Sequence, residues 1–155
     1  MKDTPYEELE KQMQKIPGFE PEKSRAGPQS FFFFLPGHRE RFESGWRGHG
    51  RPVDEDAMCA AVYLLSADRF LWEKAAGAVG PELIRFQKIR IQGINLQGYV
   101  LYHTAGDLYQ GSVRISLSEL TDPELVSSRT FHLVLLAFLI RRHGAAVLKR
   151  NGREG

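Results

Sequence analysis

The run from Ala57 to Leu65 constrains the fold most, because every side chain in it is apolar or aromatic. Asp54 precedes this run as a typical helix N-cap, and Glu55 and Asp56 fall in the first turn, where the helix dipole favours negative charge. A helix that is apolar on all faces has to be buried on all sides. The sequence therefore predicts a central helix around which the rest of the chain packs.

A second apolar run extends from Phe131 to Ile140 and is interrupted by His132. It is too short to span a bilayer, which requires about 20 residues. We therefore predict that residues 133–140 pack against residues 57–65 and that the two segments form the centre of the core. His132 is predicted to be a buried, hydrogen-bonded core residue.

The remaining elements are predicted to be mainly helical, so the fold class is mainly α, a compact helical domain with room for one small β-sheet. The predicted helices are Pro5 to about Ile16, Pro36 to Trp46, Ala67 to about Ala76 with Ser66 as its cap, a segment beginning at Gly80-Pro81, Leu96 to Tyr109, and a last helix that opens at Asp122-Pro123-Glu124 after a Thr121 cap and ends at Gly144. Short strands are predicted near Ile89–Ile91 and at Val113–Leu117.

A length of 155 residues fits one domain. We divide the chain into an N-terminal helix and linker (1–29), a globular domain (30–148) and a basic tail (149–155). Cys59 is the single cysteine, so no intramolecular disulfide can form, and no signal peptide is visible. These features predict a cytoplasmic protein that does not insert into membranes.

The most unusual local feature is the aromatic run Phe31, Phe32, Phe33 and Phe34. It is interpreted as a buried strand or core anchor, or as a partner-binding patch, since exposed apolar clusters mark interfaces. Trp46 and Arg47 are close in sequence, and binding energy concentrates in aromatic and arginine residues. We expect at least one of the four rings to be exposed near Trp46; the alternative is that all four are buried.

Basic residues offer a second kind of surface. A glycine-rich loop carries Arg47 and Arg51, and such loops can hold phosphate. The carboxyl-terminal region contributes Arg141, Arg142, Lys149 and Arg150, although the net charge of the chain is only +2. These residues are the candidates for binding nucleic acid.

Tyr99, His103 and Asp107 are spaced by four residues and share one face of the predicted helix. Asp107 could orient the imidazole of His103 as a general base, as in a small hydrolase or nuclease. No nucleophile lies at a motif position nearby. The alternative is an ordinary polar pair across one helical turn.

No metal site or cofactor is predicted. His38 and His49 are eleven residues apart, as are His132 and His143, and on a helix this spacing separates the side chains by about 16 Å. The acidic residues 54–56 are explained by capping. Cys59 lies within the most apolar helix, so we predict that it packs in the core rather than reacting.

The sequence resembles a family of short uncharacterised proteins carried by phages and integrative elements of gut Firmicutes. The similar positions are Phe32 to Phe42 around His38-Arg39, Val53-Asp54, Ala60 to Asp68, Leu96, Ala105, Asp107 to Tyr109, and Ser116 to Leu120, within a span from Phe31 to His143. The resemblance implies an accessory protein of a mobile element. Many such proteins inhibit host defences, including CRISPR nucleases, by binding them.

The predicted function is therefore that of a non-enzymatic protein that binds a partner protein, such as a host defence enzyme. Nucleic-acid binding through the Arg47–Arg51 loop and the basic carboxyl terminus is the alternative. A hydrolase or nuclease that uses His103 and Asp107 is the third hypothesis.

Overall fold

The computed structural model describes residues 31–46 and 54–148. Its helices are α2 (His38–Gly45), α3 (Glu55–Leu65), α4 (Arg69–Ala75), η1 (Ala76–Ala78), η2 (Phe86–Lys88), α5 (Leu96–Gln110), α6 (Leu117–Leu120) and α7 (Ser128–His143), where η denotes a short 3₁₀ helix. The mainly helical fold class is confirmed. The predicted helix from Pro5 to Ile16, the linker and the tail lie outside the described residues.

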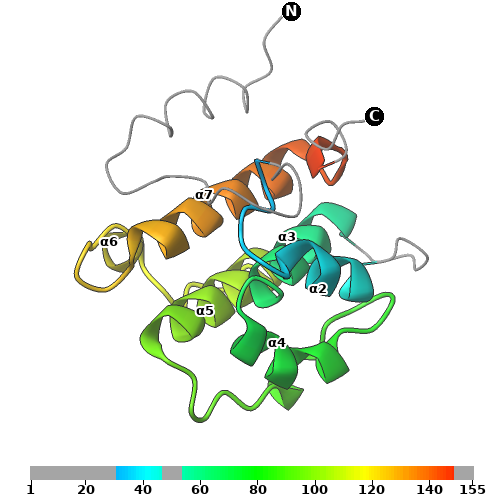
Figure 1. The fold of residues 1–155 in the computed structure, drawn as a ribbon, viewed down its shortest axis with the longest axis horizontal. Coiled ribbons are helices and arrows are strands. Elements are labelled where there is room, and N and C mark those ends of the chain that lie inside the picture. Colours follow the sequence, from blue (N-terminus) through cyan, green and yellow to red (C-terminus); the bar gives the residue numbers. More distant parts are fainter. Residues whose placement is uncertain (1–30, 47–53, 149–155) are drawn as a thin grey trace, which may run out of the picture.

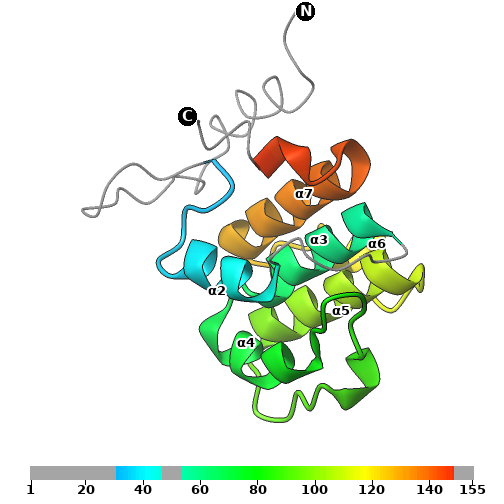
Figure 2. The same ribbon diagram turned by 90° about the vertical axis from the view of Figure 1, so that its right-hand side faces the viewer.

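Helix α3 lies at the centre of the molecule, with α7 on one side and α4 on the other (Figures 1 and 2). Its most extensive contacts are with α5 and α7. Every residue from Ala57 to Leu65 is buried, as a helix with an entirely apolar surface requires. The prediction of a central helix is confirmed.

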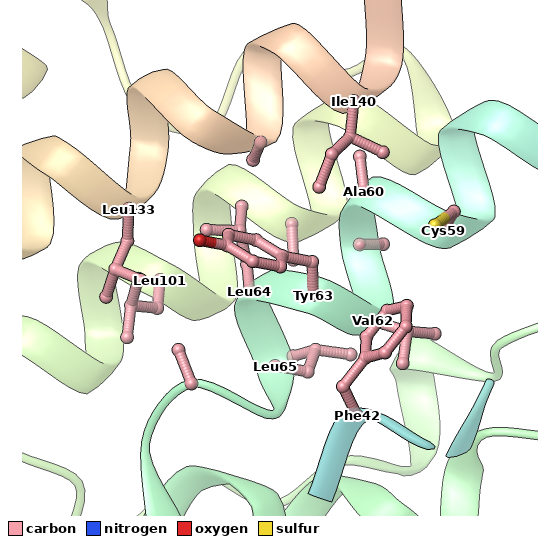
Figure 3. Packing of buried hydrophobic residues seen from close by; sticks show 14 of the residues in the cluster. Phe42, Cys59, Ala60, Val62, Tyr63, Leu64, Leu65, Leu101, Leu133 and Ile140 are labelled. Carbon is pink, nitrogen blue, oxygen red and sulfur yellow. The ribbon is translucent and has the colours of Figure 1, made fainter. Parts of the chain in front are cut away.

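The core forms where α3, α5 and α7 meet. Leu133 of α7 lies beside Leu101 of α5, and Ile140 of α7 lies above Ala60 of α3 (Figure 3). The predicted packing of residues 133–140 against residues 57–65 is confirmed, since the two helices are in contact and most side chains of both segments are buried.

Local capping fixes where several helices begin. The Asp54 carboxylate accepts a hydrogen bond from the Ala57 amide at 3.0 Å, as predicted. Asn95 caps α5 in the same way through the Gly98 amide at 2.9 Å, and Gly111 ends α5 with a positive φ of 75°. Ser66 does not cap α4: it ends α3, and Asp68 caps α4 through the amides of its first turn.

No strand occurs in residues 31–46 or 54–148, so the strands predicted near Ile89–Ile91 and at Val113–Leu117 are wrong. A single bridge joins Val79 to Ile84 in a tight reversal of the chain. That reversal also replaces the helix predicted from Gly80. Alternating apolar residues form a strand only where a neighbouring strand can pair with their amides, and this part of the molecule offers none.

The last helix begins later than predicted. Ser127, rather than Thr121, is the N-cap of α7, and its hydroxyl accepts from the Thr130 amide at 3.1 Å. Thr121 instead ends the short helix α6. Leu120 and Val126 pack in one small cluster with Val100 and Val134, and this packing turns the chain between α6 and α7. None of the helices in the described residues is long and apolar enough to cross a membrane.

Candidate functional site

The aromatic run is a core anchor, not an exposed patch. Phe32, Phe33 and Phe34 are buried, and Phe31 is half-buried against them. The Tyr63 hydroxyl donates a hydrogen bond of 2.7 Å to the backbone carbonyl of Phe32, which ties the run to α3. The expectation of a substantially exposed phenylalanine ring is therefore wrong, because three of the rings belong to the core cluster and the fourth packs against it.

Trp46 is linked to this anchor through Phe42. The ring centroids of Phe42 and Trp46 are 6.5 Å apart, and those of Phe33 and Phe42 are 5.3 Å apart. Trp46 is half-buried and packs against the core. Arg47, the remaining candidate of the predicted partner-binding patch, lies outside the described residues.

The structure separates the roles of His103 and Asp107. The Asp107 carboxylate accepts hydrogen bonds from the Ser112 hydroxyl at 2.6 Å, from the Arg114 amide at 2.8 and 2.9 Å and from the Ile115 amide at 3.0 Å. Within the described ranges it makes no hydrogen bond to the imidazole of His103. Asp107 therefore fixes the loop after α5 instead of orienting a base.

His103 does lie on one face with Tyr99, as the spacing predicts. The two ring centroids are 4.3 Å apart in an edge-to-face arrangement. Desolvation lowers the pKa of His103, the charge of Asp107 opposes this shift, and that of Arg114 adds to it. Tyr99 and His103 thus form a packed aromatic pair.

The structure describes two of the residues that were predicted to bind nucleic acid. Arg141 and Arg142 are exposed near the end of α7, and Arg141 forms an ion pair of 3.3 Å with Asp54 at the start of α3. Arg51, Lys149 and Arg150 lie outside the described residues. Neither Arg141 nor Arg142 lines the groove described below.

The buried histidines and the cysteine occupy the core. His132 is buried, as predicted, and stacks on Phe34 with ring centroids 4.2 Å apart. Cys59 is buried in α3, and burial raises the pKa of its thiol. In the part of the chain that the structure describes, no group of three or more His, Cys, Asp or Glu residues could hold a metal ion. His49 lies outside that part.

A groove of about 610 Å³ lies where the beginnings of α4, α5 and α7 meet the segment before α2. Three arginines line it, Arg41, Arg69 and Arg129, and we call it the arginine groove. Its apolar walls include Leu35 and Leu133.

The electrostatics of the arginine groove favour negative charge. Asp68 is the one carboxylate that lines it, and Oδ1 of Asp68 accepts hydrogen bonds from the amides of Phe70 and Leu71 at 2.8 and 3.2 Å. The N-caps Asn95 and Ser127 also line the groove, so the positive ends of two long helices point toward it.

Different contacts place two of the three arginines of the groove. Arg41 donates from Nε to the Ser66 carbonyl at 2.7 Å and from Nη2 to the Ala67 carbonyl at 3.0 Å. Burial lowers its pKa, yet an arginine stays charged at neutral pH. The Arg69 guanidinium lies 4.9 Å from the ring centroid of Phe70, an exposed side chain at the rim.

Sequence reasoning missed this groove. Its arginines come from α2, α4 and α7, so no local motif joins them, and each one alone is typical of a solvated helix surface.

Comparison of the chain with protein-family models, with curated proteins and with solved structures found no match.

Proposed function

We propose that this protein is a non-catalytic binding protein that holds an acidic segment of a partner protein in the arginine groove. One observation supports this most directly: three arginines and two helix amino termini face one hollow that contains a single, already engaged carboxylate. Arginine is well suited to this task because its planar fork binds carboxylates through two parallel hydrogen bonds.

The apolar walls of the groove favour a peptide over a nucleic acid. Leu35, Pro36 and Leu133 line it together with the arginines, so a segment that combines acidic and apolar side chains matches both kinds of surface. A nucleic acid would instead need a long track of cations along its phosphates. Acidic and basic side chains are nearly equal in number over the described residues. The positive charge of the groove therefore comes from the three arginines that line it, not from a basic domain as a whole.

The test uses a short labelled peptide in which glutamate and leucine alternate, with fluorescence anisotropy as the readout. We expect binding that weakens as salt is added, because the contacts are partly charged. Arg129→Glu should weaken binding about tenfold or more, equivalent to at least about 1.4 kcal/mol. Arg90→Glu is the matched control, since Arg90 is exposed and does not line the groove.

Two results would contradict the proposal. One is equal binding of the peptide to wild type and Arg129→Glu. The other is tight binding of a single-stranded oligonucleotide without binding of the peptide, which would favour the nucleic-acid alternative. A peptide in which lysine replaces glutamate checks that negative charge is required.

The resemblance to mobile-element proteins directs the search for the natural partner to host defence enzymes. The experiment is inhibition of a purified CRISPR nuclease by the wild type, by Arg129→Glu and by Arg90→Glu. We expect inhibition by the wild type and by Arg90→Glu, and much weaker inhibition by Arg129→Glu. Absence of inhibition by all three would remove this class of partner.

A further inference from the structure

Two cations of the arginine groove have no acidic partner in the part of the chain that the structure describes. Arg69 and Arg129 are exposed, and neither forms an ion pair there. Arg41 differs from them, because its guanidinium already donates to two backbone carbonyls. An acidic occupant of the groove would therefore pair with Arg69 and Arg129, whose side-chain donors are unused.

Apolar side chains lie beside these cations. Leu35 and Leu133 line the groove, and Phe70 is 57% exposed at its rim. Exposed apolar surface next to arginine is typical of a site that binds another segment of protein. The matching occupant carries carboxylates and large apolar side chains close together in its sequence.

The chain contains such a segment before the described residues. Residues 3–10 contain four carboxylates and no cationic side chain, and they include Tyr6 and Leu9. Elsewhere outside the described part the sequence is balanced or basic: residues 20–25 contain two acidic and two basic side chains, and residues 47–53 and 149–155 are basic. Residues 3–10, which we call the acidic segment, are thus the complement of the groove in both charge and apolar character.

The acidic segment is close enough in the chain to reach the groove. Leu35, a wall residue, lies four positions after Phe31, so the groove wall is within about 14 Å of Phe31. Residues 11–30 separate the acidic segment from Phe31, and 20 residues of coil have a mean end-to-end distance of about 25 Å. A connection of this length gives an effective concentration of about millimolar at the groove.

We propose that the acidic segment binds in the arginine groove of its own molecule, with its carboxylates on Arg69 and Arg129 and with Tyr6 and Leu9 against the apolar walls. This inference rests on the proposed function, since it takes the groove as a site for acidic segments, and it adds a built-in competitor. A partner has to displace the acidic segment, so self-binding lowers the apparent affinity for the partner.

The first experiment locates the acidic segment in the full chain by paramagnetic broadening of NMR signals. A nitroxide is attached at Lys2→Cys, and selective attachment is expected because Cys59, the single native cysteine, is fully buried. We expect the strongest broadening at the amides of Gln97 and Ser127, which line the groove.

Two controls decide whether this broadening reports binding in the same molecule. Arg129→Glu should remove it, whereas Arg90→Glu should keep it, since Arg90 is exposed and does not line the groove. Mixing spin-labelled protein with isotopically labelled protein that carries no nitroxide should give no broadening. Broadening in the mixture would show that a second copy supplies the segment and would overturn the proposal.

The second experiment measures competition with the labelled glutamate and leucine peptide. The double variant Glu7→Lys, Glu8→Lys should bind the peptide about threefold or more tightly than the double variant Glu20→Lys, Glu22→Lys. Both double variants change the net charge of the chain equally, so a general attraction between the protein and the peptide cancels in this comparison. Only the first removes carboxylates from the acidic segment.

The outcomes separate this inference from the proposed function. If the peptide binds both double variants with equal affinity and the groove amides are not broadened, the acidic segment does not occupy the groove, whereas the proposed function stands. If the groove amides are broadened in the wild type but the peptide binds neither double variant, the self-contact is supported and the proposed partner is contradicted. Broadening that is unchanged in Arg129→Glu would overturn the inference.

Discussion

Nε2 of His38 lies 2.8 Å from the backbone carbonyl oxygen of Tyr63, so this fully buried imidazole carries a proton on Nε2 and donates it to α3. Nδ1 has no hydrogen-bond partner in the described part of the chain. Burial lowers the pKa of His38 to about 3, and it lowers that of His132 to about 3 as well. The core on both sides of Phe33 and Phe34 is therefore built around neutral histidines.

This arrangement predicts that the protein loses stability in mild acid. The unfolded chain binds protons at both histidines below a pH of about 6.5, whereas the folded chain binds them only near pH 3. In that window the unfolded state binds more protons, so the free energy of unfolding falls as the pH falls. The limiting slope is about 1.4 kcal/mol per pH unit for each histidine. Urea unfolding at pH 7, 6 and 5 measures it.

His38→Gln should reduce this slope, although the variant starts from lower stability because the buried site is disturbed. His143→Gln, at the carboxyl end of α7, is the control and should keep the wild-type slope. A slope that is the same in His38→Gln and wild type would mean that His38 is not the neutral buried group described here.

The core prediction concerns Leu64 and Leu136, which are both fully buried where α3 meets its neighbours. Leu64→Ala or Leu136→Ala should lower the free energy of unfolding by about 2–5 kcal/mol, because each leaves a cavity that the helices cannot fill. Leu117→Ala is the control, since Leu117 is 74% exposed. Equal stability of all three variants would place the core elsewhere.

The predictions were correct where the residues that define the start, end or burial of a helix all lie in one short stretch of the chain. Asp54 and the apolar run after it predict the start and the burial of α3, and the segment Leu96–Tyr109 followed by Gly111 predicts α5 to within one residue. The prediction of a helix N-cap at Thr121 was wrong, because the residues after it have the local pattern of a helix start although no helix begins there. There the packing of Leu120 and Val126 against α5 and α7 overrides the local preference.

The sites could not be predicted for a related reason. The aromatic run has the composition of an interface. Whether its rings are exposed depends on whether they pack against α3 and α7 in the fold, which the local sequence does not show. Arg41 and Arg129 are separated by 88 positions in the chain and line one groove because α2 and α7 both pack on α3. No spacing rule joins residues so far apart.

Cys59 is predicted to be unreactive in the folded protein. It is fully buried, and burial together with Asp56 and Glu55 raises the pKa of its thiol, so little thiolate forms near neutral pH. A disulfide reagent such as Ellman's should label it slowly at pH 8 and rapidly after unfolding in urea. Fast labelling of the native protein would show that α3 opens locally or that the thiol is accessible.

The last prediction concerns Asp107, which the structure assigns to the loop after α5. Asp107→Asn keeps the shape of the side chain but removes its charge and turns an NH₂ group toward donors. The variant should lose about 1–3 kcal/mol of unfolding free energy, as expected when bonds to a charged acceptor are broken.

Hydrogen exchange at the Arg114 and Ile115 amides should accelerate, because both donate to this carboxylate. The pKa of His103 should fall further, since the Asp107 charge raises it. Asp122→Asn is the control, because the Asp122 carboxylate accepts from the single amide of Glu124 and should cost less. Unchanged stability and exchange in Asp107→Asn would contradict the structural role and return Asp107 to the candidates for catalysis beside His103.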